Sequence, residues 1–366
     1  MRLTPWTGRH RRPVLLVLLA LLLPGAAWAE PTVLWRFASG DPALVPILAD
    51  QSGLVAAGRR SWGLDGEGRR LWQTDLPSPA HFRPRPGRLD GRPVVLIAGR
   101  EGLALIDRGD GRVLWQEAPE REFGAPTVAG DRLLVGDENR LEVRALSDGQ
   151  VLWTHTLGRG VIHYPPLVRD GVVYLGGGDR HLRAFRLADG KPLWAHDMSH
   201  PWTYLRRLDP GPDQGPIVAG AYEDALLGLD PATGAILWDH RSGNFINSFL
   251  VAQGRVHFWS PRGWMVALSA TSGELLWRTR THRFGRDGRA DWSMVMAAPV
   301  RIGDHLAVLD MAGTVHLLDP AGGDERAAVR LPFPARPFLA PLANGDVIAA
   351  DTAGTIHRLR LPSGAD

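Results

Sequence analysis

Residues 228–238 read GLDPATGAILW, and this stretch contains the unit from which the chain is built. An alternating segment that ends at Leu229 leads into an Asp-x-x-x-Gly turn, and Leu237 and Trp238 follow. Alternation with period two and a turn of this composition predict two strands joined by a tight turn. The ending Gly-x-x-x-Trp occurs six times, at Gly68 and Trp72, Gly111 and Trp115, Gly149 and Trp153, Gly190 and Trp194, Gly234 and Trp238, and Gly273 and Trp277.

Two further copies of the unit are incomplete. Residues 318–323 (LDPAGG) align with residues 229–234 and place Ala327 where the other copies have tryptophan. Residues 356–364 (IHRLRLPSG) form the first half of an eighth copy, and Val33, Leu34 and Trp35 supply its second half. Successive tryptophan positions are 37 to 50 residues apart, a spacing typical of four-stranded propeller blades. The sequence therefore predicts eight blades, with the first and last strands pairing to close the ring.

Each unit also contains one apolar strand that is expected near the middle of its blade. These eight strands begin at Leu54, Val94, Leu133, Val172, Ile217, Val256, Leu306 and Val347. No long segment has the 3.6-residue period of an amphipathic helix, so we expect very little helix. The fold class is all-β, and residues 30–366 are expected to form a single eight-bladed β-propeller of four-stranded antiparallel blades.

The recurring tryptophans are expected to hold the blades together. A blade cannot bury both of its faces alone, so its neighbours must cover them. A large aromatic residue at one fixed place can lie between two blades while its indole N–H binds a backbone carbonyl. We assign this structural role to Trp35, Trp72, Trp115, Trp153, Trp194, Trp238 and Trp277. Ligand stacking is the alternative role, and the uniform spacing disfavours it.

The N-terminus is typical of a cleavable secretory signal over residues 1–29. Four arginines precede an apolar run at 14–23, and Ala27-Trp28-Ala29 precedes Glu30. The apolar run is shorter than the roughly 20 residues that span a bilayer. Removing the segment takes away four positive charges and changes the formal net charge from +3 to −1. We expect the mature chain in the periplasm.

The composition argues against several functional classes. The chain contains no cysteine, so it has no disulfide, thiolate metal site, cysteine nucleophile or acylated cysteine. Lys191 is the only lysine, and the arginines are scattered among acidic residues, which disfavours nucleic-acid binding. Among the thirteen histidines, His196 and His200 are four apart but adjoin Pro201, so a helical metal pair is not expected. No catalytic, cofactor-binding or metal-binding residue is predicted.

The Asp-x-x-x-Gly-x-x-Leu-Trp segment at 230–238 resembles the PQQ-like β-propeller repeat. Quinoprotein dehydrogenases and the outer-membrane assembly factor BamB share this repeat. The dehydrogenase resemblance implies a vicinal disulfide, which a chain without cysteine cannot form, and a Ca²⁺ site for which no acidic cluster has the spacing. A PQQ-binding oxidoreductase therefore stays the alternative. Residues 295–300 (VMAAPV) and 354–359 (GTIHRL), with the length and blade number, look like the end of BamB.

The BamB resemblance implies a non-catalytic periplasmic scaffold for the assembly and insertion of outer-membrane β-barrel proteins, without a cofactor. Its partner would be the POTRA domains of a BamA-like insertase in a Bam-type complex. By position, the family's binding residues fall near Leu157 and Arg159, and near Leu208, Asp209 and Asp213. Aspartate beside proline or glycine often only begins a turn, which is the alternative role of the acidic pair.

One feature of that family is missing, because BamB is usually a lipoprotein and this chain has no cysteine to acylate. Either the chain is a periplasmic form held at the outer membrane by its partner, or it is a paralogue that binds another periplasmic protein or a glycan.

The longest departure from the repeat is a basic and aromatic loop at 278–292. It contains Arg278, Arg280, His282, Arg283, Phe284, Arg286, Arg289 and Trp292. Arginine and aromatic residues are enriched at interfaces, and long loops on rigid scaffolds often carry function. The loop is therefore either an interaction surface or a solvated insertion.

Overall fold

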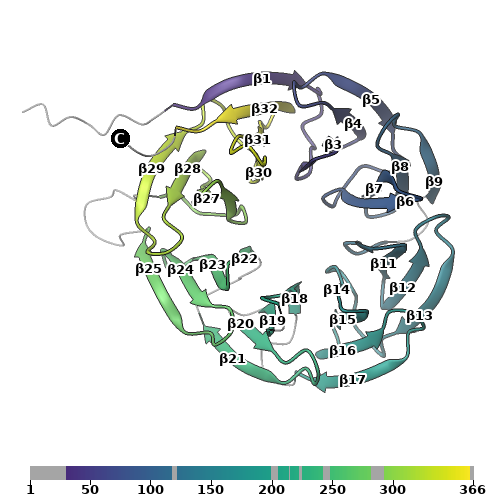
Figure 1. The fold of residues 1–366 in the computed structure, drawn as a ribbon. Helices are drawn as coiled ribbons and strands as arrows, with labels where there is room; N and C mark the ends of the chain where they lie inside the picture. The colour runs from purple at the N-terminus through teal and green to yellow at the C-terminus, as the bar shows by residue number, and fades with distance from the viewer. Residues whose placement is uncertain are drawn as a thin grey trace, which may run out of the picture.

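A computed structural model describes residues 30–117, 122–198, 205–213, 215–221, 225–241, 248–281 and 292–362. These residues form a closed ring of eight four-stranded antiparallel sheets, or blades, around a central axis (Figure 1). In each blade the first strand lies next to the axis and the last lies at the rim (Figure 1). The predicted all-β, eight-bladed propeller is confirmed.

The strands follow one another from the axis to the rim in each blade. The first four blades are β2 (Leu48–Asp50), β3 (Gly53–Ala57), β4 (Arg60–Leu64), β5 (Arg70–Asp75); β6 (Arg85–Leu89), β7 (Arg92–Ala98), β8 (Leu103–Asp107), β9 (Val113–Glu117); β10 (Thr127–Ala129), β11 (Arg132–Asp137), β12 (Arg140–Ala145), β13 (Val151–Thr156); and β14 (Leu167–Arg169), β15 (Val172–Gly176), β16 (His181–Arg186), β17 (Pro192–Asp197). The next four are β18 (Leu205–Asp209), β19 (Ile217–Ala221), β20 (Ala225–Leu229), β21 (Ile236–Arg241); β22 (Phe249–Ala252), β23 (Arg255–Ser260), β24 (Trp264–Ser269), β25 (Leu275–Arg280); β26 (Val300–Ile302), β27 (His305–Leu309), β28 (Thr314–Leu318), β29 (Glu325–Arg330); and β30 (Ala340–Pro341), β31 (Val347–Ala350), β32 (Thr355–Arg360), β1 (Thr32–Ala38).

The eighth blade joins the two ends of the chain. Strand β1 is antiparallel to β32, with Thr32 opposite Arg360 and Ala38 opposite Thr355. In Figure 1 the N-terminal strand lies at the rim beside the C-terminal one. The predicted closure is therefore confirmed, and it leaves no blade without a neighbour on either side.

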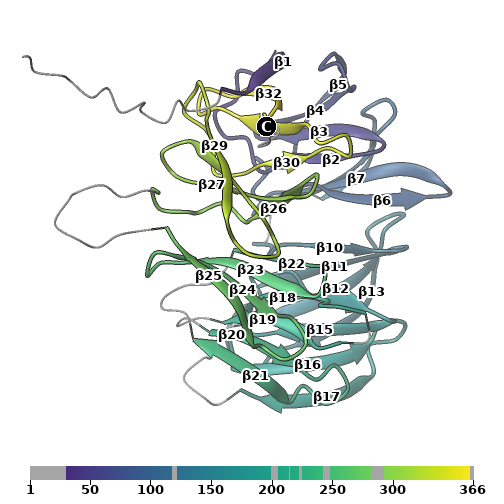
Figure 2. The ribbon, with the colours of Figure 1, turned by 60° about the vertical axis from the view of Figure 1, so that its left-hand side comes forward.

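The middle strands of each blade are covered on both faces by the adjacent blades. Every residue of β20 is buried, whereas the rim strand β21 has alternating exposure. In Figure 2 the sheets of neighbouring blades face one another. Between the fifth and sixth blades, Val218 and Leu226 pack with Val256 and Phe258. The eight predicted apolar strands are the second strands of the blades, and each begins within two residues of its predicted start. The described residues contain no helix, and hence none that could cross a membrane.

Each repeat glycine lies beneath the tryptophan of the preceding blade, not beneath its own. A Cβ added to Gly111 would lie 2.7 Å from Cγ of Trp72, and the φ angle of Gly111 is +78°. The Trp72 indole N–H donates to the carbonyl oxygen of Arg108 at 2.8 Å in the same neighbouring turn. Glycine is thus required twice, for the left-handed φ angle and for the close approach of the ring.

The same contact recurs around the ring. The corresponding pairs are Trp35 with Gly68, Trp115 with Gly149, Trp153 with Gly190, Trp194 with Gly234, Trp238 with Gly273, and Trp277 with Gly323. Five more of these indoles donate to a carbonyl of the next blade at 2.8 to 3.2 Å. Among the described residues the Trp238 N–H has no hydrogen-bond partner, and it lies against Gly228 of its own blade.

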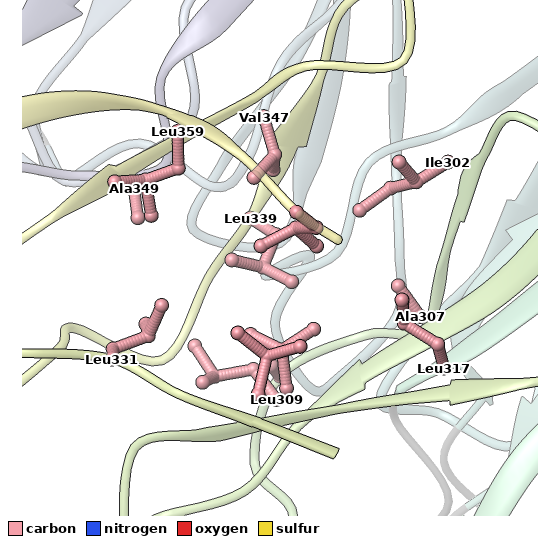
Figure 3. Packing of buried hydrophobic residues seen from close by; sticks show 13 residues of the cluster. Ile302, Ala307, Leu309, Leu317, Leu331, Leu339, Val347, Ala349 and Leu359 are labelled. Carbon is pink, nitrogen blue, oxygen red and sulfur yellow. The ribbon is translucent and has the colours of Figure 1, made fainter. Parts of the chain in front are cut away.

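The seventh blade lacks this tryptophan. Ala327 lies opposite Leu317 with an irregularity in the next pair, as Trp277 lies opposite Ala267 in the sixth blade. Aliphatic side chains fill the interface between the seventh and eighth blades instead (Figure 3). They include Ile302, Leu309, Leu317, Leu331, Leu339, Val347 and Leu359.

A buried histidine in the seventh blade is held by two carboxylates. His316 Nδ1 lies 2.7 Å from Glu325 and Nε2 lies 3.5 Å from Asp310, while Trp292 stacks on the ring with centroids 3.7 Å apart. Burial alone would lower the pKa of His316, but the hydrogen bonds and charges of Asp310 and Glu325 outweigh it and raise the pKa. His257 shows the opposite case, since burial and then the charges of Arg255 and Arg301 lower its pKa to about 4.

The first prediction compares two glycines with nearly equal φ angles. Gly111→Ala introduces a clash with Trp72, whereas Gly91 (φ +79°) has open space around it. Both alanines place a side chain in the left-handed region, which costs about 1–2 kcal/mol. Only Gly111→Ala adds the cost of overpacking, about 1–3 kcal/mol. Urea unfolding should therefore show the larger loss for Gly111→Ala, and equal losses would contradict the interblade contact.

The second prediction concerns pH. Because the folded pKa of His316 is raised, its stabilising effect is complete below the unfolded value near 6.5 and is lost as the pH rises through the folded pKa. The free energy of unfolding should therefore fall as the pH is raised across that range, and His316→Gln should remove this fall. His257 affects stability in a different pH range. Because its folded pKa is lowered to about 4, the folded state loses stability as the pH falls from about 6.5 to 4. A His257→Gln variant that keeps the His316 profile serves as the control.

Candidate functional site

The loops of the ring lie on two opposite faces. Because the four strands of a blade alternate in direction, the connection to the next blade leaves from the same side as the turn between the second and third strands. We call this side the linker face; it carries loop 157–166 and the turn at 177–180. The opposite side, the hairpin face, carries the turns between first and second strands, such as 170–171 and 210–216.

Hydrogen bonds between loops agree with this division. On the linker face, the Leu157 N–H donates to the carbonyl of Asn139, and the Gly178 N–H donates to the carbonyl of Val161. On the hairpin face, the Arg169 guanidinium donates to the carbonyls of Pro210 and Gly215, each at 2.8 Å. The five predicted partner-binding residues are therefore split between the two faces.

Leu157 and Arg159 lie on the linker face with different surroundings. Leu157 follows β13 and is only 1% exposed, because it packs into the core between the third and fourth blades. The Asn139 amide donates to its carbonyl at 2.9 Å. Arg159 is exposed two residues later. Leu157 thus anchors the loop, and Arg159 is the one of the two predicted residues that the loop exposes.

A second buried residue holds the other end of the same loop. Ile162 is 1% exposed, and its N–H donates to the carbonyl of Glu138 at 2.7 Å. A Cβ on Gly136 or Gly124 would overlap the Ile162 carbonyl oxygen, so both positions require glycine for the loop to lie there. The segment between the two anchors is thus held firmly against the blades.

A pocket adjoins this loop on the linker face. It has a volume of about 400 Å³ and is lined by His81, Phe82, Arg100, Glu122, Phe123, His163 and Tyr164. The Arg100 guanidinium lies 3.7 Å from Glu122 and donates to His81 at 3.3 Å. Burial and then the Arg100 charge lower the pKa of His81, so its ring is neutral near pH 7. The pocket offers aromatic surface and a few polar groups, as protein-binding sites commonly do.

Sequence reasoning missed this pocket. Its residues come from three connections between blades and, in the case of Arg100, from the turn between β7 and β8. They do not recur at one position of the repeat. A signal was present in the clustering of His163 and Tyr164 immediately after the Leu157 loop. Only the folded ring brings these side chains together.

The other three predicted residues lie elsewhere. Leu208 is on the axial strand β18 and packs into the core between the fourth and fifth blades. Asp209 ends that strand; burial raises its pKa against the opposing effects of the Gly211 N–H and the Arg207 charge. Asp213 is exposed in the following turn, on the hairpin face. Strand β15 separates the two faces, so the structure does not bring Asp213 together with Arg159.

No group of three or more metal-ligating side chains occurs within the described ranges. Residues 282–291 of the basic loop, residues 1–29 and His200 lie outside those ranges. Arg278, Arg280 and Trp292, at the ends of the basic loop, lie within them.

The third prediction tests the anchoring of loop 157–164. Gly136→Ala places a Cβ against the Ile162 carbonyl, whereas Gly158→Ala, in the loop itself, meets no atom within 4 Å. Amide hydrogen exchange at Leu157 and Ile162 should accelerate about tenfold or more in Gly136→Ala, a change of about 1.4 kcal/mol in local opening. It should stay near the wild-type rate in Gly158→Ala. Equal rates in all three proteins would show that the loop does not depend on Gly136.

Comparison with known proteins places the ring in a family. A family model described as outer membrane protein assembly factor BamB matches residues 29–125, 99–209 and 202–350. The outer membrane protein assembly factor BamB of Yersinia pestis is 26% identical over 297 residues, which cover 75% of this chain and 72% of that protein.

Two solved structures share the fold. BamB from Moraxella catarrhalis has a TM-score of 0.68 at 20% identity, covering 90% of this chain and 100% of that one. Quinohemoprotein alcohol dehydrogenase from Comamonas testosteroni has a TM-score of 0.65 at 10% identity, covering 92% of this chain and 78% of that one. The fold alone is common to assembly factors and enzymes. The family match extends through nearly the whole ring, and the chain belongs to the PQQ-like propeller family of outer membrane protein assembly factor BamB.

Proposed function

We propose that this chain is a non-catalytic periplasmic scaffold in the assembly of outer-membrane β-barrel proteins. The family match over most of the ring carries this proposal, and the curated relative named above is an outer membrane protein assembly factor. The partner would be the POTRA domains of a BamA-like insertase. The chain would be exported by its N-terminal segment 1–29 and would lie at the outer membrane through this partner.

The contact surface that we propose is the linker face around loop 157–164 and the adjoining pocket. Arg159 is exposed in this loop, Val161 is 42% exposed and Tyr164 is 36% exposed. Arginine and tyrosine are the residue types that most often dominate binding energy at protein interfaces. Because Leu157 and Ile162 already fix the loop, binding would require little further ordering, which lowers the entropic cost.

The hairpin face is the less favourable surface for the same partner. Strand β15 has five residues, which corresponds to about 17 Å along the strand. Asp213 therefore lies across the thickness of the disc from Arg159. A domain seated on loop 157–164 would contact Arg159 and not Asp213. A separate contact through Asp209 and Asp213 stays a prediction, and it can be tested independently.

The fourth prediction measures binding of purified POTRA domains of a BamA-type insertase to the purified chain. Arg159→Glu and Tyr164→Ala should each weaken binding about tenfold or more, as expected for central interface residues. Arg88→Glu, on the hairpin face, is the charge-matched control and should bind like the wild type. Calorimetric titration of each variant, with thermal unfolding to verify its fold, provides the measurement.

Other outcomes would overturn parts of the proposal. If Asp213→Lys weakens binding and Arg159→Glu does not, the contact lies on the hairpin face. If the folded wild-type chain binds no POTRA domain, the scaffold function is wrong. A dehydrogenase activity that depends on added PQQ and Ca²⁺ would contradict the non-catalytic assignment.

A further inference from the structure

A second surface of the linker face, over blades five to seven, has a different chemical character. Between the fifth and sixth blades there is a cleft of about 180 Å³, which we call the arginine–tryptophan cleft. It is lined by His240, Arg241, Ser260, Arg262, Trp264, Val266, Leu275 and Arg278. No acidic side chain is among these residues. Ligand pockets usually measure about 300–1,000 Å³, so this cleft suits one small polar head group.

Two arginines stack on the tryptophan at the cleft. The guanidinium carbon of Arg278 lies 4.7 Å from the ring centroid of Trp264, and that of Arg280 lies 5.3 Å away. Both arginines are exposed, and they are two residues apart on β25, so they lie on the same face of that strand. Stacking holds the Arg278 guanidinium in a fixed plane, from which its N–H edges can still bind a ligand.

Two arginines of this cleft have no carboxylate partner among the described residues. Within the described ranges the side chains of Arg262 and Arg278 form no ion pair and donate no hydrogen bond. Elsewhere in the ring arginines have acidic partners at short distance: Arg108 with Asp50 at 2.7 Å, and Arg69 with Asp65 at 2.7 Å. Arg262 and Arg278 therefore place two positive charges at the cleft without a carboxylate partner in the described ranges.

An exposed patch of methionines continues the surface toward the seventh blade. Met294, Met296 and Met311 are 53% to 57% exposed. The Met311 N–H donates to the carbonyl of Met294 at 2.7 Å, so two of them lie side by side. Half of the six methionines in the chain are in this patch. Methionine side chains are flexible and adapt to irregular apolar surfaces.

The cleft and the patch are linked through Thr281. The Thr281 N–H donates to the carbonyl of Gly263, beside Arg262, and the Trp292 N–H donates to the carbonyl of Thr281. Met294 follows Trp292 by two residues. The cleft and the methionine patch are thus connected through backbone hydrogen bonds on the linker face, away from loop 157–164.

We propose that this surface binds the anionic phospholipid head groups of a membrane. The arginine N–H groups would form paired hydrogen bonds with phosphate oxygens, and the methionines would contact the boundary between head groups and acyl chains. Tryptophan and arginine are favoured at that boundary. The cleft, with a volume of about 180 Å³, has room for a phosphate group. This inference goes beyond the scaffold function and does not depend on it.

The fifth prediction is tested by co-sedimentation of the chain with vesicles. Vesicles of phosphatidylcholine with phosphatidylglycerol should bind the protein, and vesicles of phosphatidylcholine alone should not. Each arginine near an anionic surface contributes about fivefold in affinity, so Arg262→Gln/Arg278→Gln should bind about 25-fold more weakly. Met294→Ser/Met311→Ser should also weaken binding. Arg88→Gln/Arg112→Gln, on the hairpin face, is the matched control and should bind like the wild type.

Several results would overturn the inference. One is equal binding to both kinds of vesicle, and another is binding that the Arg262/Arg278 variant retains. A third is stabilisation by inorganic phosphate that depends on these arginines without any vesicle binding, which would identify a site for free phosphate. A fourth is loss of POTRA binding in the same variant with no vesicle binding by the wild type, which would identify the surface as a protein contact. If the surface binds membranes, the Arg262/Arg278 variant should bind POTRA domains like the wild type. Failure of the membrane inference can therefore be distinguished from failure of the scaffold proposal.

Discussion

The ring depends on the contact between the indole of one blade and a glycine of the next. In the pair Trp72 and Gly111, the glycine has a φ angle of +78° and no room for a Cβ, and the indole N–H binds a carbonyl of the same turn. Each blade is therefore docked to its neighbour through a turn that is itself part of the repeat. Such arrays gain stability from nearest-neighbour interfaces, and pairing of β1 with β32 gives every blade two of them.

This mode of docking separates stability from binding. The tryptophans and glycines hold the blades together, so the connections between blades can differ in sequence without opening the ring. Loop 157–164 shows how a connection becomes rigid: Leu157 and Ile162 are buried at its ends, and Gly136 leaves space for its backbone. Arg159 is then presented from a fixed position. The antiparallel order of the strands places it on the face opposite to Asp213.

The distribution of charge has the same dependence on the fold. Several ion pairs inside or between blades have a buried member. The buried Arg144 contacts Glu142 and Glu117, and the half-buried Arg358 contacts the buried Asp346 at 2.6 Å. Breaking such a buried pair leaves a desolvated charge, so these pairs keep their side chains in place. Arg262 and Arg278 instead lie beside Trp264 without an acidic neighbour in the cleft. Two arginines without an acidic partner among the described residues therefore lie together at one place on the ring.

Much of the architecture follows from the sequence alone. The glycine and tryptophan spacing, the missing residue at Ala327 and the split eighth unit determined the blade number, the closure and the position of each apolar strand, because a repeated local pattern has one way to bury its faces. Only the tertiary structure decided that each glycine serves the preceding blade's tryptophan, that Leu157 is buried while Arg159 is exposed, and that the two predicted binding segments lie on opposite faces. These features depend on contacts between residues of different repeats. The spacing of the repeats along the sequence does not tell which of those residues are close in space.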